Sequence, residues 1–357
     1  MASQRTGERM LSLDFECLRS IPEGINEVRV WHDNLLDCDR VGKRIDTSSA
    51  STGDVLPEPA TLQSIQHRNV VPILAAAIVD GYQPPLRVVE IVTPYYPRGS
   101  ITDALLRGER FVASEAVAIV QAALRGLGEL HEVHGICHRD IKSGNILLPD
   151  DLTVAKVADL GLAGAFSADG TVPALNNPTL YSPPEIASTG LLSRPSDIYP
   201  MGLVLRELLG GAFPYVDYKT ASIVQRLAHG RCPLTRLDLE LPVWTSRSLR
   251  RIVGKALKKD PAERYQSAAE MDGALARATV LDWTQVHEMR WEAPFLYQNR
   301  RVAVTADYRP SRGDYRVSTL TRKTSWRRAT GDVYLADLVG VAARKVFDHA
   351  SDIATAS

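Results

Sequence analysis

The chain has 357 residues, enough for two or three domains, and its 42 basic and 42 acidic residues cancel. Without a net charge, no global field draws the chain to nucleic acid or to a membrane. The amino terminus lacks the apolar core of a signal peptide, and no apolar stretch approaches the ~18 residues that span a bilayer. The four cysteines lack metal-ligand spacing, so we expect reduced thiols in a cytoplasmic protein.

The first predicted elements are strands. Val28 to Trp31 and Arg40 to Ile45 alternate between apolar and polar residues, which predicts a hairpin. Two further strands are predicted at residues 71–79 and 86–92. Together these segments are expected to belong to a five-stranded sheet.

A long amphipathic helix is predicted from Ala113 to His134, and its wide apolar face indicates a core position. His131 and His134 are expected at its polar margin, near the end where positive charge suits the helix dipole. Metal binding by this pair is disfavoured, because no acidic or cysteine ligand lies between them.

The stretch from Cys137 to Leu162 contains two short apolar runs joined by a turn. Ile146 to Leu148 and Val154 to Val157 predict a pair of strands. This hairpin would place several polar residues of the stretch at one end of the strands.

Those polar residues have the chemistry of a phosphate and metal site. Asp140 and Asn145 precede the first strand, and Asp159 follows the second. Carboxylate and amide oxygens are the ligands that Mg²⁺ prefers. Lys142 could neutralise the charge of a transferred phosphoryl group.

The residues from His138 to Asn145 and from Asp159 to Gly161 resemble the catalytic and metal-binding motifs of the eukaryotic-like serine/threonine protein kinases. The resemblance implies an α+β, bilobal protein-kinase fold. It places a small β-rich N-lobe at residues 10–99, after a flexible N-terminus at 1–9, and a larger helical C-lobe at 100–278. Residues 279–357 would be a small C-terminal α+β extension.

The resemblance also implies roles for the polar residues. Asp140 would accept the proton of the substrate hydroxyl, and Lys142 would contact the moving phosphoryl group. Asn145 and Asp159 would hold the Mg²⁺ ions that bridge the phosphates of ATP. Lysine at position 142 resembles the serine/threonine branch of the family.

The same resemblance assigns a nucleotide site to the N-lobe. Lys43 would pair with the phosphates and Glu58 with Lys43, although Lys43 could be a solvent-facing strand residue and Glu58 a first-turn acid that suits a helix dipole. Gly24 is the single glycine where the family usually has three, which weakens the expected phosphate loop. Thr93 would guard the back of the pocket, and the main chain around Tyr95 would bind adenine.

Residues 159–185 resemble an activation segment. Arg139 would dock a phosphate carried by this segment, and autophosphorylation would regulate the chain. Pro178 stands where the family has a threonine that braces the catalytic aspartate, so that brace is lost or shifted. The hydroxyls available for phosphorylation are Ser167, Thr171 and Thr179.

The resemblance also implies that three further residues support the catalytic stretch. Asp197 would hold the catalytic loop from below, or serve only near the cap of its own helix; the two interpretations are compatible. Glu185 and Arg264 are predicted to form a buried ion pair, and breaking one side should cost about 3–5 kcal/mol.

The C-terminal residues alternate like strands at Arg301 to Tyr308 and Tyr315 to Leu320, and a helix is predicted from Asp332 to Ile353. Basic residues exceed acidic ones by seven between Arg300 and Arg328. A partner for this basic module is conceivable, as nucleic acid or an acidic protein. A solvated sheet face packed on the kinase is preferred, and nucleic acid is the less favoured partner. Autophosphorylation in this segment is a further hypothesis.

We therefore expect a cytoplasmic protein kinase that transfers the γ-phosphate of ATP, with Mg²⁺, to serine or threonine of protein substrates that the sequence does not specify. Two alternatives stay open. One is a pseudokinase or scaffold with little phosphotransfer, which the eroded glycine loop and Pro178 favour. The other is a kinase-like phosphotransferase acting on small molecules.

Overall fold

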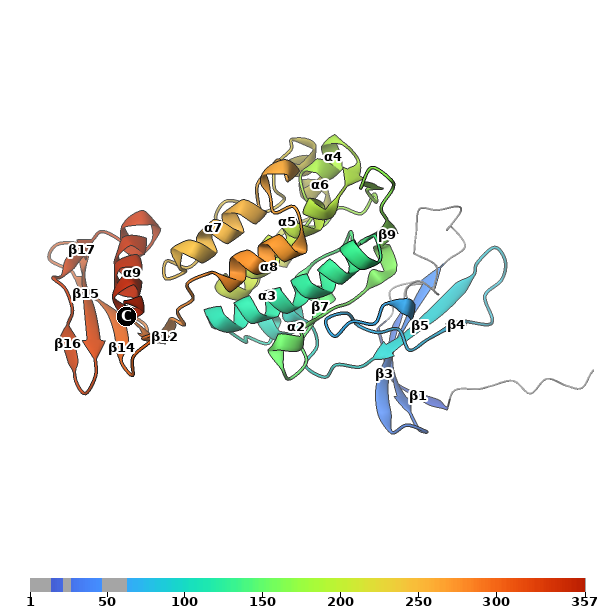
Figure 1. Ribbon diagram of the computed structural model, residues 1–357, viewed down its shortest axis with the longest axis horizontal. Helices are drawn as coiled ribbons and strands as arrows, with labels where there is room; N and C mark the ends of the chain where they lie inside the picture. Colours follow the sequence, from blue (N-terminus) through green and yellow to red (C-terminus); the bar gives the residue numbers. More distant parts are fainter. Residues whose placement is uncertain (1–13, 22–26, 47–62, 357) are drawn as a thin grey trace, which may run out of the picture. The chain divides into compact units, whose positions relative to one another are not determined.

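The computed structural model describes residues 14–21, 27–46 and 63–356 (Figure 1). These residues form two compact units. The first holds the described residues up to Gln66 together with Val71–Pro97, and the second holds His67–Val70 and the chain from Arg98 onward. Gly24 and Glu58 lie outside the described residues.

The first unit contains a five-stranded antiparallel sheet in the order β1-β2-β3-β5-β4. The predicted hairpin and the five-stranded sheet are confirmed. The strand expected at 71–79 is shorter than predicted and keeps only four residues. The strands are β1 (Phe15–Ile21), β2 (Val28–Asp33), β3 (Cys38–Asp46), β4 (Ala75–Ile78) and β5 (Val88–Pro94).

The second unit is helical around α5 (Arg194–Gly210), a helix that is buried on nearly every side. The predicted long helix is confirmed as α3 (Ala113–Gly128), which packs on α5 and continues into the π-helical turn η1 (Glu129–Val133). The other helices of this region are α2 (Ile101–Leu106), α4 (Glu185–Ser188), α6 (Thr220–Ala228), α7 (Arg247–Ala256) and α8 (Ala268–Ala276).

Short strand pairs carry the loops between α3 and α5. The predicted hairpin forms as β7 (Ile146–Leu147) with β8 (Lys156–Val157). Its second strand starts later than expected, because the Asp151 side chain accepts bonds from Thr153 and closes a 3-10 turn there. The other pairs join β6 (Ile136–Cys137) to β9 (Gly164–Ala165) and β10 (Val172–Pro173) to β11 (Leu191–Leu192).

The C-terminal residues form a six-stranded antiparallel sheet and one helix. The two strands predicted there are confirmed as β14 and β15. The elements are β12 (Thr284–His287), β13 (Arg290–Pro294), β14 (Arg301–Arg309), β15 (Asp314–Arg322), β16 (Trp326–Arg328), β17 (Val333–Leu335) and α9 (Gly340–Thr355).

The predicted start of the last helix at Asp332 is wrong. Val333–Leu335 pairs with β15 instead, as strand β17. Asp332 does not cap a helix but accepts a bond from Ser318 Oγ at 2.7 Å and pairs with Arg328. The helix begins at Gly340, whose φ of +71° suits a residue without a side chain.

The two acids of the segment from Arg300 to Arg328 each pair with an arginine of the sheet. Arg309 pairs with Asp314 across the β14–β15 turn, and Arg316 pairs with Asp307 on the facing strand at 2.8 Å. The excess of seven basic residues in this segment therefore remains after both acids are paired.

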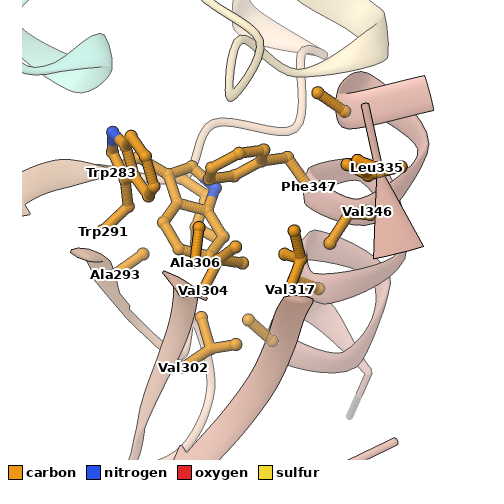
Figure 2. Packing of buried hydrophobic residues seen from close by; sticks show 14 of the residues in the cluster. Trp283, Trp291, Ala293, Val302, Val304, Ala306, Val317, Leu335, Val346 and Phe347 are labelled. Carbon is orange, nitrogen blue, oxygen red and sulfur yellow. The ribbon is translucent and has the colours of Figure 1, made fainter. Parts of the chain in front are cut away.

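An aromatic cluster joins α9 to the sheet (Figure 2). The Phe347 ring lies edge-on to Trp283 and Trp291, with centroids 5.2 and 5.5 Å away. Trp244, which precedes α7, packs against the same ring at 6.1 Å. Apolar contacts therefore continue from the sheet into the helical part of this unit.

Phe347→Ala should lower the free energy of unfolding by about 3–5 kcal/mol, because it leaves a cavity among the three tryptophans. Val341→Ala on the same helix is the control; Val341 is 67% exposed, and we expect a change within about 0.5 kcal/mol. Urea unfolding followed by tryptophan fluorescence measures both. Equal losses in the two variants would contradict the packing of Phe347 against the tryptophans.

Candidate functional site

The predicted catalytic residues of the second unit meet on the loop between β6 and β7. Asp140 is 8% exposed, and Lys142 Nζ lies 2.7 Å from its Oδ2. The amide nitrogen of Asn145 donates to Asp140 O at 2.8 Å and to Asp140 Oδ2 at 2.9 Å. The loop therefore holds one carboxylate between a cation and an amide.

The β7–β8 pair brings Asp159 to the same end of the strands. Ile146 pairs with Val157, and the next bond runs from Ala158 N to Asn145 O at 2.9 Å. Asp159 has a φ of +62°, an unusual conformation for a residue with a side chain. The pairing thus brings the main chain of Asn145 beside the residue that precedes Asp159.

The carboxylate of Asp197, near the start of α5, fixes the beginning of this loop. It accepts bonds from His138 N at 2.8 Å, from Arg139 N at 3.0 Å and from His131 Nε2 at 2.8 Å. Burial by itself raises the pKa of Asp197, but the bonds from His131 and His138 outweigh it, so this pKa lies below its usual value. The expectation that Asp197 holds the catalytic loop is confirmed.

The expectation that His131 lies at a polar margin is wrong. His131 is 1% exposed and points to Asp197. An α-helical period already puts His131, four residues after Leu127 and seven after Leu124, on the buried face of the helix. His134 lies 3.4 Å from Glu129.

Arg139 contacts the main chain of the activation segment. Its guanidinium donates to Leu162 O at 2.6 Å, Ala163 O at 2.9 Å and Pro173 O at 3.0 Å. A Cβ on Gly164 would meet Arg139 Cζ at 2.7 Å, so this close approach needs glycine. The guanidinium that was expected to bind a phosphate is therefore hydrogen-bonded to main-chain carbonyl groups.

The hydroxyls proposed for phosphorylation form local contacts. Ser167 and Thr171 both donate to the Asp169 carboxylate, at 2.6 and 2.7 Å. Thr179, which follows Pro178, accepts a bond from Tyr181 N at 3.2 Å.

The ion pair predicted between Glu185 and Arg264 is confirmed. Both Nη atoms of Arg264 lie 2.6 Å from the two Glu185 oxygens, and the side chains are 0% and 7% exposed. The Arg264 nitrogens also donate to main-chain oxygens, including Pro195 O at the start of α5. This bidentate contact links the end of the activation segment, through Arg264, to the start of α5.

Three residues assigned to nucleotide binding, Lys43, Thr93 and Tyr95, lie on or just after two neighbouring strands of the first unit. Lys43 is on β3, between β2 and β5, and pairs with Val28 and Ile91. Thr93 is on β5 opposite Val41, and Tyr95 N donates to Asp39 O at 3.3 Å just after that strand.

One buried acid near the loop was missed by the sequence analysis. Glu207 on α5 is 0% exposed and accepts a bond from Ser143, the residue after Lys142. A signal was present, because Arg206 and Glu207 interrupt an otherwise apolar run in this helix. A charged residue inside an apolar helix usually has a specific partner.

None of the helices in the described part of the chain has the length and apolar character that a membrane-spanning helix requires.

Comparison with known proteins agrees with this arrangement. A model of the protein kinase domain matches residues 36–274. Serine/threonine-protein kinase PrkC of Bacillus subtilis is 30% identical over 239 residues, which cover 66% of this chain and 34% of that protein. Receptor-like serine/threonine-protein kinase NCRK of Arabidopsis thaliana is 35% identical over 185 residues, 48% of this chain and 32% of that protein.

Serine/threonine-protein kinase PknB of Mycolicibacterium smegmatis is 32% identical over 192 residues, 52% of this chain and 30% of that protein. The matched residues thus span about a third of the length of these relatives. The family match itself covers well over half of this chain and includes the catalytic loop, Asp159, Asp197 and the Glu185–Arg264 pair. The chain belongs to the protein kinase family.

Proposed function

We propose that this chain transfers the γ-phosphate of ATP to serine or threonine hydroxyls of protein substrates. The observation that carries the proposal is the cluster of Asp140, Lys142 and Asn145 on one anchored loop. In this mechanism Asp140 orients the substrate hydroxyl and accepts its proton, and Lys142 balances the charge of the phosphoryl group in transfer.

The donor set around Asn145 suits Mg²⁺. The amide nitrogen of Asn145 is used in two bonds to Asp140, which leaves its carbonyl oxygen as an acceptor. Asp159 adds a carboxylate, and hard oxygen ligands of these kinds suit Mg²⁺. When bound, Mg–ATP supplies the phosphoryl group, with the metal neutralising charge on the phosphates.

The nucleotide contacts of the first unit are part of the same proposal. Lys43 would hold the phosphates, Thr93 would limit the depth of the adenine pocket, and the main chain at Tyr95 would bind adenine. Gly24 and Glu58 keep their predicted roles as the remaining phosphate-loop glycine and the partner of Lys43. Autophosphorylation of the activation segment also remains a prediction.

We also propose that residues 279–357 act as an accessory module fixed to the helical lobe. Polar contacts support this attachment, in addition to the packing of Trp244 against Phe347. Arg250 pairs with Asp348 of α9 at 2.8 Å, and Ser114 at the start of α3 donates to Asp282 at 2.7 Å. Its contacts use the starts of α3 and α7, away from the loop that carries Asp140.

Asp140→Asn should lower phosphotransfer by at least about 100-fold, because the amide cannot accept the hydroxyl proton. Transfer of labelled phosphate from Mg–ATP to a generic protein substrate measures the effect. Asp150→Asn removes an exposed carboxylate from the β7–β8 turn and serves as the matched control with unchanged activity.

Asp159→Ala separates the alternatives in the same assay. It should abolish transfer and weaken Mg-dependent nucleotide binding together. A wild-type protein that binds Mg–ATP but labels no protein would reject the proposal in favour of a scaffold role. Label found only on a small molecule would reject protein as the substrate class.

Asp197→Asn should lower the free energy of unfolding at pH 7 by about 2–3 kcal/mol, because an amide leaves buried donors unpaired. The folded pKa of Asp197 lies below its usual value, so its carboxylate stabilises the fold fully above the unfolded pKa of about 3.9. That contribution is lost as the pH falls through the lower folded value.

The difference in stability between wild type and Asp197→Asn should therefore be constant from about pH 7 to 5 and shrink below about pH 4. Urea unfolding at a series of pH values measures it. A difference that stays constant to the lowest pH at which both proteins fold would contradict the assigned role.

A further inference from the structure

Glu207 lies inside the helical lobe, outside the set of residues to which the proposed reaction assigns a role. It is near the end of α5, is 0% exposed, and carries a carboxylate. A buried carboxylate is costly unless hydrogen bonds or a cation compensate for the lost water. The neighbouring Arg206 donates to the main-chain oxygens of Gly211 and Glu240 instead.

Four neutral donors satisfy this carboxylate. Its Oε2 accepts bonds from Ser143 Oγ and from Tyr181 OH, the latter at 2.5 Å. Its Oε1 accepts bonds from Tyr215 OH at 2.5 Å and from Phe213 N at 3.2 Å. An ionised carboxylate has about four acceptor positions, so the capacity of Glu207 is filled.

The two phenols remain donors at ordinary pH. Burial, together with the charge of Glu207, raises the pKa of Tyr181 and of Tyr215 well above the usual tyrosine value. Ser143 is itself 0% exposed, so solvent does not compete for its hydroxyl. Bonds from such donors to a buried charge are stronger than bonds between neutral groups.

The donors come from segments with different tasks. Ser143 directly follows Lys142 in the catalytic loop, and Tyr181 lies four residues before Glu185 at the end of the activation segment. Tyr215 belongs to the chain that follows α5. One carboxylate thus connects the loop that carries Asp140 to the segment that follows it in the chain.

Two acids of α5 therefore hold the catalytic loop on both sides of Asp140. Asp197 binds the main chain at His138 and Arg139, before Asp140, and Glu207 binds Ser143, after Lys142. The two acids are ten residues apart on one helix, about 15 Å along its axis. A rigid helix of this kind fixes the separation of the two ends of the loop.

We propose that Glu207 is a positioning residue of the phosphotransfer reaction, acting through Ser143 and Tyr181 on the geometry of Asp140 and Lys142. The inference rests on the proposed function, because the geometry that it sets is that of the catalytic loop. Loss of the bond should slow the chemical step and leave substrate binding largely unchanged.

Ser143→Ala in the full-length chain tests this most gently, since it removes one hydroxyl. We expect kcat to fall about tenfold, with the KM for ATP and for protein substrate within about twofold of wild type. Tyr181→Phe should act in the same direction. Tyr218→Phe is the matched control, because it removes another bond between a phenol and a carboxylate, that of Tyr218 with Asp238. The phenol of Tyr218 contacts residues 235–238, so this variant should leave kcat unchanged.

A double-mutant cycle with Glu207→Gln identifies the partner. If Ser143 acts through Glu207, Ser143→Ala should lower kcat by less than about twofold in the Glu207→Gln background. A kcat of Ser143→Ala equal to that of wild type, or a full tenfold loss in both backgrounds, would overturn the proposal.

Hydrogen exchange of the peptide covering residues 139–146 gives a readout that does not depend on activity. Exchange there should accelerate at least about tenfold in Ser143→Ala and stay unchanged in Tyr218→Phe. If the wild type transfers no phosphate but exchange changes as expected, the proposed function fails while the positioning contact stands. Unchanged exchange in Ser143→Ala would overturn the contact itself.

Discussion

The buried carboxylate of Asp197 is the interaction on which the helical lobe depends. A charge that is 2% exposed is tolerated only because a histidine, two main-chain N–H groups and a thiol donate to it. The same bonds fix the main chain just before Asp140. A movement of the catalytic loop would therefore break the bonds that compensate for burying this charge, so the burial of Asp197 stabilises the conformation of the loop.

The rest of the lobe extends this principle. The Glu185–Arg264 pair anchors the end of the activation segment, and its arginine also binds the main chain at the start of α5. Arg139 binds the carbonyl groups of the same segment, where Gly164 leaves room for its guanidinium. Asp197, Arg264 and Arg139 are each positioned by several partners at once, which gives the loops a defined conformation in a region with few regular strands.

Elements with a strong local signal could be predicted from the sequence. The hairpin β2–β3, the helix α3 and the strands β14 and β15 have clear apolar periodicity, and all four form. The prediction at Asp332 failed because Val333–Leu335 gains more from pairing with β15 than from starting a helix. The interpretation of His131 failed because this residue, four after Leu127 and seven after Leu124, lies within the apolar face, where it contacts Asp197.

Through its resemblance to the protein kinases, the sequence by itself determined the family, the residues of the catalytic loop, the anchoring role of Asp197 and the Glu185–Arg264 pair, because short motifs carry the particular chemical groups of that family. Only the tertiary structure decided the other partners of these groups. It placed Glu207 beside Ser143, turned Arg139 toward carbonyl groups, and packed Trp244 against Phe347. Each of these contacts joins residues distant in the chain or depends on the fold around them, and local sequence patterns carry no information about such contacts.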